Sequence, residues 1–201
     1  MNVSTYSDVT EGDLESVLEE RGAILHGHFL LSSGRHSDVF VQKFRVLEDA
    51  PLAERLGELL ADRFKNDFDV VASPAVGAVV LGFVTALAAG RRFVFAERSN
   101  DKMEFRRGFT FEPDERVLVV EDVVTTGGSV AEVVDVVKAL GGDVVGVGAL
   151  IDRADPSRAK DLGAPLEALV TLPVQSWAKD DCPLCERGET LDDPGSRRLR
   201  A

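Results

Sequence analysis

Two acidic residues stand directly between an apolar run and a loop of small polar residues. Glu121 and Asp122 follow the apolar run 117–120, and shortly after them comes a loop made of Thr125, Thr126, Gly127, Gly128 and Ser129. Glycines let the backbone turn tightly enough to aim several N–H groups at one point, and a helix that begins there adds partial positive charge. Such a loop suits a phosphate monoester. The carboxylates beside it could accept from sugar hydroxyls or be screened by a divalent cation.

A simpler interpretation of the same loop remains open. It could be an ordinary strand-to-helix turn in which a threonine or serine merely caps the helix. The acid pair directly after a buried strand weighs against that interpretation. No Gly-Lys-Ser/Thr follows, so the loop is not a Walker A sequence, and the absence of G-x-G-x-x-G disfavours dinucleotide binding.

The elements that must position this loop form an alternating pattern. Short apolar runs predict strands at 69–73, 92–97, 116–121, 143–150 and 166–172. Apolar residues at helical spacing predict helices at 50–64, 77–89, 128–140 and about 156–162. This alternation indicates an α/β fold, with a mainly parallel twisted sheet and helices on both faces. Ligands of such sheets bind beyond the carboxyl ends of the strands, which is where the acid pair stands.

Three parts are expected along the chain. Residues 1–45 contain a predicted helix after Thr10 and two short strands around a Ser-Gly turn, and we call this part the hood. Residues 46–177 form the α/β core, and residues 178–201 form a tail that packs on the core or frays from it. Within the core, the polar segment 98–108 is expected to be an exposed, mobile loop.

Composition excludes several classes of function. The 201 residues include 35 acids and 23 bases, and the net charge of −12 disfavours nucleic-acid binding. The apolar runs are too short and too rich in glycine for a membrane span, and the first residues show no signal-peptide pattern. With two cysteines and no export signal, the protein is expected to be reduced and cytoplasmic. An acidic protein of this kind must hold any anion at a local site.

The segment 98–108 offers such a local site, because it carries four cations: Arg98, Lys102, Arg106 and Arg107. A solvated hairpin is the alternative. The sequence "CPLC" supplies two thiolates, so two copies of the chain across a two-fold axis could complete a four-thiolate zinc site. A plain reduced turn is the simpler interpretation. The histidines at 26, 28 and 36 have no ligand-like spacing and are expected to be hood or surface residues.

The stretch "VLVVEDVVTTGGS", residues 117–129, resembles the phosphoribosyl-pyrophosphate (PRPP) motif of the type I phosphoribosyltransferases. It has four apolar residues, two acids, two more apolar residues and a Thr- and Gly-rich loop. The resemblance implies that Glu121 and Asp122 engage the ribose hydroxyls and that the backbone of residues 125–129 holds the 5-phosphate.

Other segments are similar to the orotate phosphoribosyltransferase family along nearly the whole chain. "HGHFLLSSGRHSDVFVQK" resembles its hood, "SPAVGAVVLG" its pyrophosphate loop, and "FAERSNDKMEFRRGF" its flexible catalytic loop. "GALIDRAD" resembles the strand whose terminal arginine meets the carboxylate of orotate, and "CPLCERGETLDDPGSR" resembles the tail of one bacterial branch. Arg153 would then form a bidentate pair with orotate, although it could equally pair with Asp152 or Asp155 at the surface.

The same resemblance assigns the remaining roles. Phe40 and Val41 would wall the pyrimidine, unless they are ordinary core, and Arg98 would contact substrate. Lys102 and Arg106 would act with Asp122 as catalytic residues. Many relatives carry lysine at the positions of Ser32, Val76 and Ser99, so their phosphate contacts must be made by other groups here, such as Lys43 or the loop arginines.

The reaction implied is transfer of the phosphoribosyl group from PRPP to orotate, giving orotidine 5-phosphate and pyrophosphate. Mg²⁺ is expected as the cofactor, held mainly through PRPP and water, with no protein residue binding it directly. The expected unit is a homodimer in which loop 98–108 of one chain completes the site of the other, because a loop with four cations has little apolar surface to hold it over its own site. A purine phosphoribosyltransferase, or a PRPP-sensing regulator on the same fold, are the alternatives.

Overall fold

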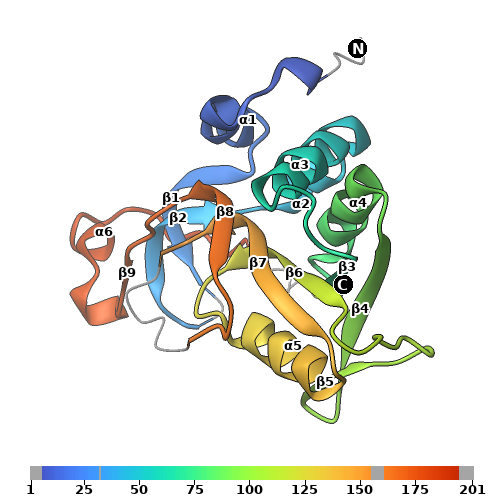
Figure 1. The fold of residues 1–201 in the computed structure, drawn as a ribbon. Helices are drawn as coiled ribbons and strands as arrows, with labels where there is room; N and C mark the ends of the chain where they lie inside the picture. The colour runs from blue at the N-terminus through green and yellow to red at the C-terminus, as the bar shows by residue number, and fades with distance from the viewer. Residues whose placement is uncertain (1–5, 32, 155–160, 195–201) are drawn as a thin grey trace.

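The computed structural model describes residues 6–31, 33–154 and 161–194. A six-stranded sheet lies at its centre, with strand order β5-β4-β3-β6-β7-β8 (Figure 1). The strands are β3 (Val70–Pro74), β4 (Arg92–Ser99), β5 (Lys102–Phe105), β6 (Arg116–Val124), β7 (Asp143–Asp152) and β8 (Leu166–Thr171). All neighbouring strands are parallel except β5, which runs antiparallel to β4. The predicted α/β fold with a mainly parallel sheet is confirmed.

Helices cover both faces of this sheet, and β6 shows why. Leu118 and Val120 of β6 pack in one apolar cluster with α3 (Ala50–Arg63) and α4 (Val79–Ala89). Val117 and Val119 pack in a second cluster with α5 (Gly128–Ala139). Successive side chains of a strand point to opposite faces, so a continuous apolar run serves two helical layers at once.

The hood contains a second, smaller sheet. Two 3₁₀ turns, Tyr6–Asp8 and Glu11–Asp13, precede α1 (Leu14–Glu20), and the antiparallel strands β1 (Ile24–Leu30) and β2 (His36–Val41) follow, ending in α2 (Phe44–Leu47). The predicted helix and strand pair are therefore confirmed. The third strand of this sheet is β9 (Ser176–Trp177), which follows β8 in the chain and pairs with β2. The division of the chain at residues 45 and 177 stays a prediction.

The described part of the tail packs on the hood. After a 3₁₀ turn at Lys179–Asp181, the helix α6 (Pro183–Glu186) buries Leu184, and Cys182 just before it is buried too. Further on, Asp192 N–H donates to the carbonyl of His28 at 2.8 Å, and Leu30 N–H donates to the carbonyl of Asp192 at 2.8 Å. These residues therefore add backbone hydrogen bonds to β1 of the hood, and the expectation that the tail packs on the core or frays from it stays a prediction.

The segment 98–108 forms a β-hairpin for most of its length, where an irregular loop was expected, and its mobility stays a prediction. The turn consists of Asn100 and Asp101, whose φ angles of 48° and 63° are left-handed, a conformation that these two residue types tolerate. Met103 of β5 is buried in the apolar cluster beneath α5. The charges of the segment conceal this apolar anchor in the sequence.

The remaining expectations were met with small shifts of boundary. The predicted strands and the helices at 50–64, 77–89 and 128–140 are present, but β6 continues through Glu121 and Asp122 to Val124, so the acid pair lies inside the strand. Most of the helix expected at about 156–162 falls outside the described residues. None of the helices in the described part of the chain is both long and apolar enough to cross a membrane.

Candidate active site

A hollow of about 230 Å³ lies at the carboxyl end of β6, where the chain turns into α5. Its lining comprises Glu121, Val123, Val124, Thr125, Thr126, Gly127, Gly128, Ser129, Val130 and Glu132. Gly127 adopts a left-handed φ of 76° and is the N-cap of α5, without a side-chain capping hydrogen bond. Glycine has no side chain that could cap the helix, so the N-cap position of α5 is not held by a threonine or a serine. The first N–H groups of α5 have no partner within the helix and favour an anion.

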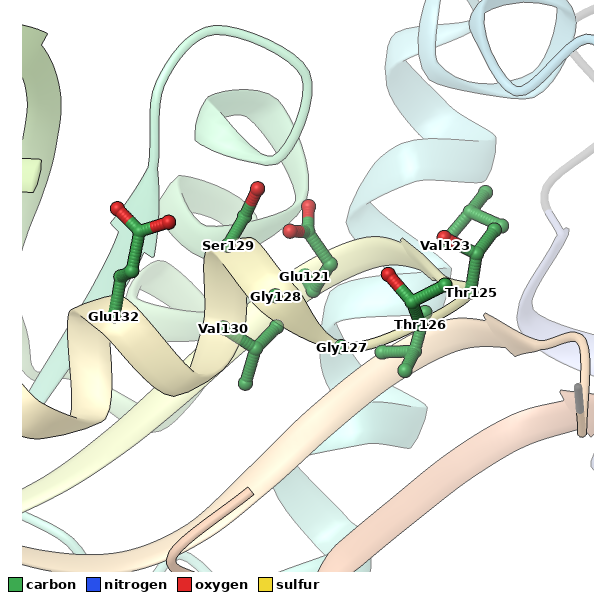
Figure 2. A pocket seen from close by; sticks show the side chains of 10 residues that line it. Glu121, Val123, Thr125, Thr126, Gly127, Gly128, Ser129, Val130 and Glu132 are labelled. Atoms are coloured by element: carbon green, nitrogen blue, oxygen red, sulfur yellow. The ribbon is translucent and has the colours of Figure 1, made fainter. Parts of the chain in front are cut away.

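Glu121 is the acid that faces this hollow. Its carboxylate points to the same side of the loop as the hydroxyl of Ser129 (Figure 2). Burial, and then the charge of Asp122, raise the pKa of Glu121 to about 8, well above its ordinary value of 4.5. The N–H of Asp122, which donates to Glu121 at 3.0 Å, and the charge of Lys43 oppose this rise in pKa. Near neutral pH the acid therefore holds a proton until a donor or cation reaches it.

Asp122 lies behind the hollow rather than in its lining. The residue is only 2% exposed, and its carboxylate forms an ion pair with Lys43, which stands just after β2 of the hood. The N–H of Val123 donates to the same carboxylate at 2.6 Å. Gly77, in the loop before α4, comes so close that any Cβ there would overlap both the carboxylate and the lysine ammonium. The hood, β6 and the loop before α4 thus meet at one buried charge.

Two of the four cations in the hairpin, Arg98 and Arg107, form ion pairs with nearby carboxylates. Arg98 donates to both carboxylate oxygens of Glu132, at 3.1 and 3.2 Å, and Glu132 lines the hollow. Arg107 donates to both oxygens of Glu97 at 2.9 Å, which lowers the pKa of Glu97. Lys102 and Arg106 are exposed, and neither belongs to the lining of the hollow.

Arg153 lies at the same edge of the sheet as the loop. It follows β7, and its N–H donates to the carbonyl of Val124 at 3.0 Å, so its backbone adjoins the first residue of the loop. Phe40 and Val41 end β2 and are half-buried rather than enclosed; the Phe40 ring lies 5.7 Å from that of Phe29. The structure therefore brings Arg153 to the end of the sheet where the loop lies, and Lys43, which follows β2, to Asp122.

Two of the three positions where the resemblance implies a lysine in relatives can be placed. Val76 is 79% exposed in the loop before α4, and Ser99 is the last residue of β4, whereas Ser32 lies outside the described residues. The ion pair of Lys43 shows that this lysine reaches the acid pair. Glu132 was missed from the sequence, although its position in the first turns of α5, three residues after Ser129, could have indicated that it faces the loop.

Comparisons with known proteins agree with this geometry. A sequence model of the family described as "Phosphoribosyl transferase domain" matches residues 46–165. The orotate phosphoribosyltransferase of Pelotomaculum thermopropionicum is 47% identical over 192 residues, which cover 95% of this chain and 100% of that protein. The structure of orotate phosphoribosyltransferase from Aeropyrum pernix is 29% identical, with a TM-score of 0.65, covering 79% of this chain and 93% of that chain.

The fold alone does not select the base that is transferred. Adenine phosphoribosyltransferase from Rhodothermus marinus has a TM-score of 0.66 at 22% identity, covering 81% of this chain and all of that chain. That likeness shows the shared architecture only. The sequence similarity to the Pelotomaculum protein is much higher and extends through the hood and tail. The chain belongs to the phosphoribosyltransferase family, in its orotate phosphoribosyltransferase branch.

Proposed function

We propose that this protein transfers the 5-phosphoribosyl group of PRPP to orotate, giving orotidine 5-phosphate and pyrophosphate, a step of pyrimidine nucleotide synthesis. The observation that carries the proposal is the hollow at residues 125–129, with the carboxylate of Glu121 on the same side as the Ser129 hydroxyl (Figure 2). One half of the hollow suits a phosphate, and the other half suits sugar hydroxyls. The orotate phosphoribosyltransferase relatives supply the identity of the base.

The loop and the acid pair would bind the ribose phosphate. Backbone N–H groups of residues 125–129 and the N-terminus of α5 would hold the 5-phosphate, and Glu121 would accept from the ribose hydroxyls. Asp122 would contact the ribose after Lys43 turns away from it. The ammonium of Lys43 would then be available to the pyrophosphate, which compensates for the lysines that relatives carry elsewhere.

Orotate would lie between the sheet edge and the hood. Arg153 offers a planar guanidinium that can form two parallel hydrogen bonds with the carboxylate of orotate. Phe40 and Val41, half-buried at the end of β2, would contact the pyrimidine ring. Thr125, next to the Val124–Arg153 backbone hydrogen bond, is placed to contact the base or the phosphate.

The chemistry requires placement and charge neutralisation more than proton transfer. A bond forms between the ring nitrogen of orotate and the anomeric carbon while the bond from that carbon to pyrophosphate breaks, through oxocarbenium character. The ring nitrogen can be ionised before attack, so no strong general base is needed. Lys102 and Arg106 would neutralise the leaving pyrophosphate, with Arg98 at the rim of the hollow, and closure of the hairpin would exclude water.

Mg²⁺ fits this donor set as an ion held mainly through PRPP and water. In the described part of the chain, Asp122 is paired with Lys43 and Glu132 with Arg98, which leaves Glu121 as the lining carboxylate without an ion pair to a cation. One carboxylate does not make a cage, and Mg²⁺ usually binds substrate phosphates with few protein ligands. When bound, the ion would neutralise charge on the pyrophosphate.

A homodimer is part of the proposal, and α4 supports it. Val76, Val80, Phe83 and Leu87 are 79%, 39%, 54% and 57% exposed, and their spacing places them along one side of the helix and the loop before it. A second copy of the chain would cover this apolar stripe, since isologous pairing places the same surface on both partners.

A lack of apolar surface does not support sharing of the hairpin, because Met103 is buried and anchors the hairpin to its own chain. Sharing is supported instead by Lys102, beside the turn of the hairpin, and Arg106, just after the other end of β5, since neither residue lines the hollow of its own chain. We therefore retain the proposal that these two residues complete the partner's site.

The direct test follows the loss of orotate with PRPP and Mg²⁺, beside parallel assays with adenine, hypoxanthine and xanthine. We expect orotate to be consumed and the three purines to remain unchanged. Turnover of a purine without orotate would instead show a purine phosphoribosyltransferase. PRPP binding with no turnover of any base would favour a PRPP-sensing protein.

A further inference from the structure

Two histidines of the hood and the two cysteines of the tail meet at one point. His28 and His36 lie on β1 and β2, and Cys182 and Cys185 lie at the start and third position of the α6 turn. One ligand atom from each of the four residues lies within 4.8 Å of all the others. His28, His36 and Cys182 are at most 3% exposed, and Cys185 is partly buried. The proposed reaction uses none of these residues.

Four of the six separations among these atoms lie close to the edges of a zinc coordination tetrahedron, and the other two are within 4.8 Å. His28 Nε2 lies 2.9 Å from His36 Nδ1, 3.5 Å from Cys182 Sγ and 3.7 Å from Cys185 Sγ, and Cys185 Sγ lies 3.2 Å from His36 Nδ1. Zn–N bonds of about 2.0 Å and Zn–S bonds of about 2.3 Å give edges of about 3.3 to 3.8 Å in a regular tetrahedron. Shifts of a few tenths of an ångström in these four separations, and of up to about 1 Å in the other two, would therefore admit the ion.

The surroundings orient one imidazole for coordination. Nδ1 of His28 lies 2.9 Å from the carbonyl oxygen of Glu189. A carbonyl only accepts, so Nδ1 carries the proton and Nε2 presents its lone pair to the cluster. A zinc-bound histidine usually donates its other ring N–H in a hydrogen bond of this kind, which fixes the orientation of the ring. His36 is held in register by the pairing of β2 with Trp177 of β9.

We propose that His28, His36, Cys182 and Cys185 bind one Zn²⁺ within a single chain. Two thiolates and two neutral imidazoles form the set that selects zinc in tetrahedral sites, and two thiolates balance the charge of the ion in this buried place. Binding releases the two thiol protons to solvent. Four protein ligands leave no open position, so the site is structural.

The proposed ion joins segments that are far apart in the sequence. It would fasten α6 to β1 and β2, beside the backbone hydrogen bonds that Asp192 makes with β1. β2 begins at His36 and ends at Phe40 and Val41. Lys43, two residues after the strand, forms the ion pair with Asp122. Zinc bound at the first residue of β2 would therefore stabilise this strand, whose last residues face the proposed substrate pocket. No second chain is needed to complete the ligand set.

The test measures metal content in the full-length protein, purified without an affinity tag and without added chelator. We expect about one zinc per chain by elemental mass spectrometry. Replacement by Co²⁺ should give the visible d–d bands of a tetrahedral site together with thiolate-to-metal charge transfer. Cys185→Ser and His28→Gln should each weaken zinc affinity by more than about tenfold. His26→Gln is the matched control, because His26 also lies on β1 but is exposed and pairs with Glu19; it should retain the metal.

Measurements on the wild-type chain keep the proposal falsifiable if a variant fails to fold. Both thiols should resist alkylation until a strong chelator removes the metal, and chelation should lower the midpoint of thermal unfolding. Wild-type protein that takes up neither Zn²⁺ nor Co²⁺ would overturn the proposal. So would a mass lower by two hydrogens, which indicates a Cys182–Cys185 disulfide, or full metal retention in Cys185→Ser and His28→Gln.

Discussion

Arg98 donates two hydrogen bonds to Glu132, at 3.1 and 3.2 Å, and this pair joins the β4–β5 hairpin to the rim of the phosphate hollow. Without substrate, Arg98 is thus neutralised by a carboxylate that lines the hollow. An incoming phosphate would compete with Glu132 for the guanidinium and would be repelled by the carboxylate.

Glu132→Gln should therefore tighten the binding of PRPP by roughly fivefold, the equivalent of about 1 kcal/mol for a partly exposed pair. Isothermal titration calorimetry with PRPP measures this change. Glu97→Gln is the matched control, since Glu97 forms a similar bidentate pair with Arg107 but does not line the hollow. Weaker PRPP binding in Glu132→Gln would show that the pair positions Arg98 rather than restraining it.

Binding of PRPP with Mg²⁺ should release a proton from Glu121. The pKa of about 8 means that the acid is mostly neutral at pH 7, whereas hydroxyl donors and cations favour its charged form. Calorimetry in buffers of different ionisation enthalpy should show nearly one proton released per site at pH 6.5, and almost none above pH 9. Glu121→Gln should abolish this release. A pH-independent heat in the wild type would contradict the assignment.

The same group affects stability in a defined pH window. Its folded pKa is raised from 4.5 to about 8, so its stabilising contribution is complete below pH 4.5 and is lost as the pH rises through 8. Between these values, urea denaturation should show the wild type losing up to roughly 1 kcal/mol per pH unit relative to Glu121→Gln.

Removing Lys43 should destabilise the fold, because it leaves the buried carboxylate of Asp122 without its cation. Lys43→Met should lower the free energy of unfolding by about 2–3 kcal/mol, and Lys43→Met with Asp122→Asn should recover most of that loss. Arg45→Met is the control, because its pair with Glu48 is exposed and should contribute under about 0.5 kcal/mol. A double variant no more stable than Lys43→Met would show that the pair does not couple.

Arg153→Ala should raise the KM for orotate by about ten- to a hundredfold, as expected for a charge-assisted hydrogen bond, with little effect on the KM for PRPP. Only orotate carries the carboxylate, so the split between the two substrates is the diagnostic readout. Steady-state kinetics with each substrate varied in turn measure it. Equal increases for both substrates would indicate a structural role.

Subunit mixing tests the shared site. A Lys102→Ala, Arg106→Ala protein and an Asp122→Asn protein, each nearly inactive alone, should regain about a quarter of wild-type activity after re-pairing, because half of the dimers are hybrids with one intact site. Repeating the mixture with Phe83→Asp in both chains should prevent recovery, since Phe83 lies in the exposed stripe of α4. Confirmed exchange without recovery would show that the hairpin serves its own chain.

The residues around Glu121 were enough, from the sequence alone, to predict the strand, the turn and the helix of the candidate site. The apolar run 117–120, the acids and the glycine loop are local features, and strand, turn and helix patterns repeat over distances of a few residues. The order of strands and helices, the α/β class and the position of the loop at a strand end therefore followed without coordinates. The hairpin at 98–108 was the exception, because one methionine anchors it among many charges.

Only the tertiary structure decided which distant groups meet. Lys43 and Asp122 are far apart in the chain, as are Arg98 and Glu132, and each pair exists because separate elements converge at one edge of the sheet. His28 and His36 are the clearest case. Their spacing resembles no ligand motif, and "CPLC" offers only two thiols, yet β1, β2 and α6 pack together and bring four ligand atoms within 4.8 Å. Sequence spacing encodes local geometry, whereas such a site depends on how remote segments pack.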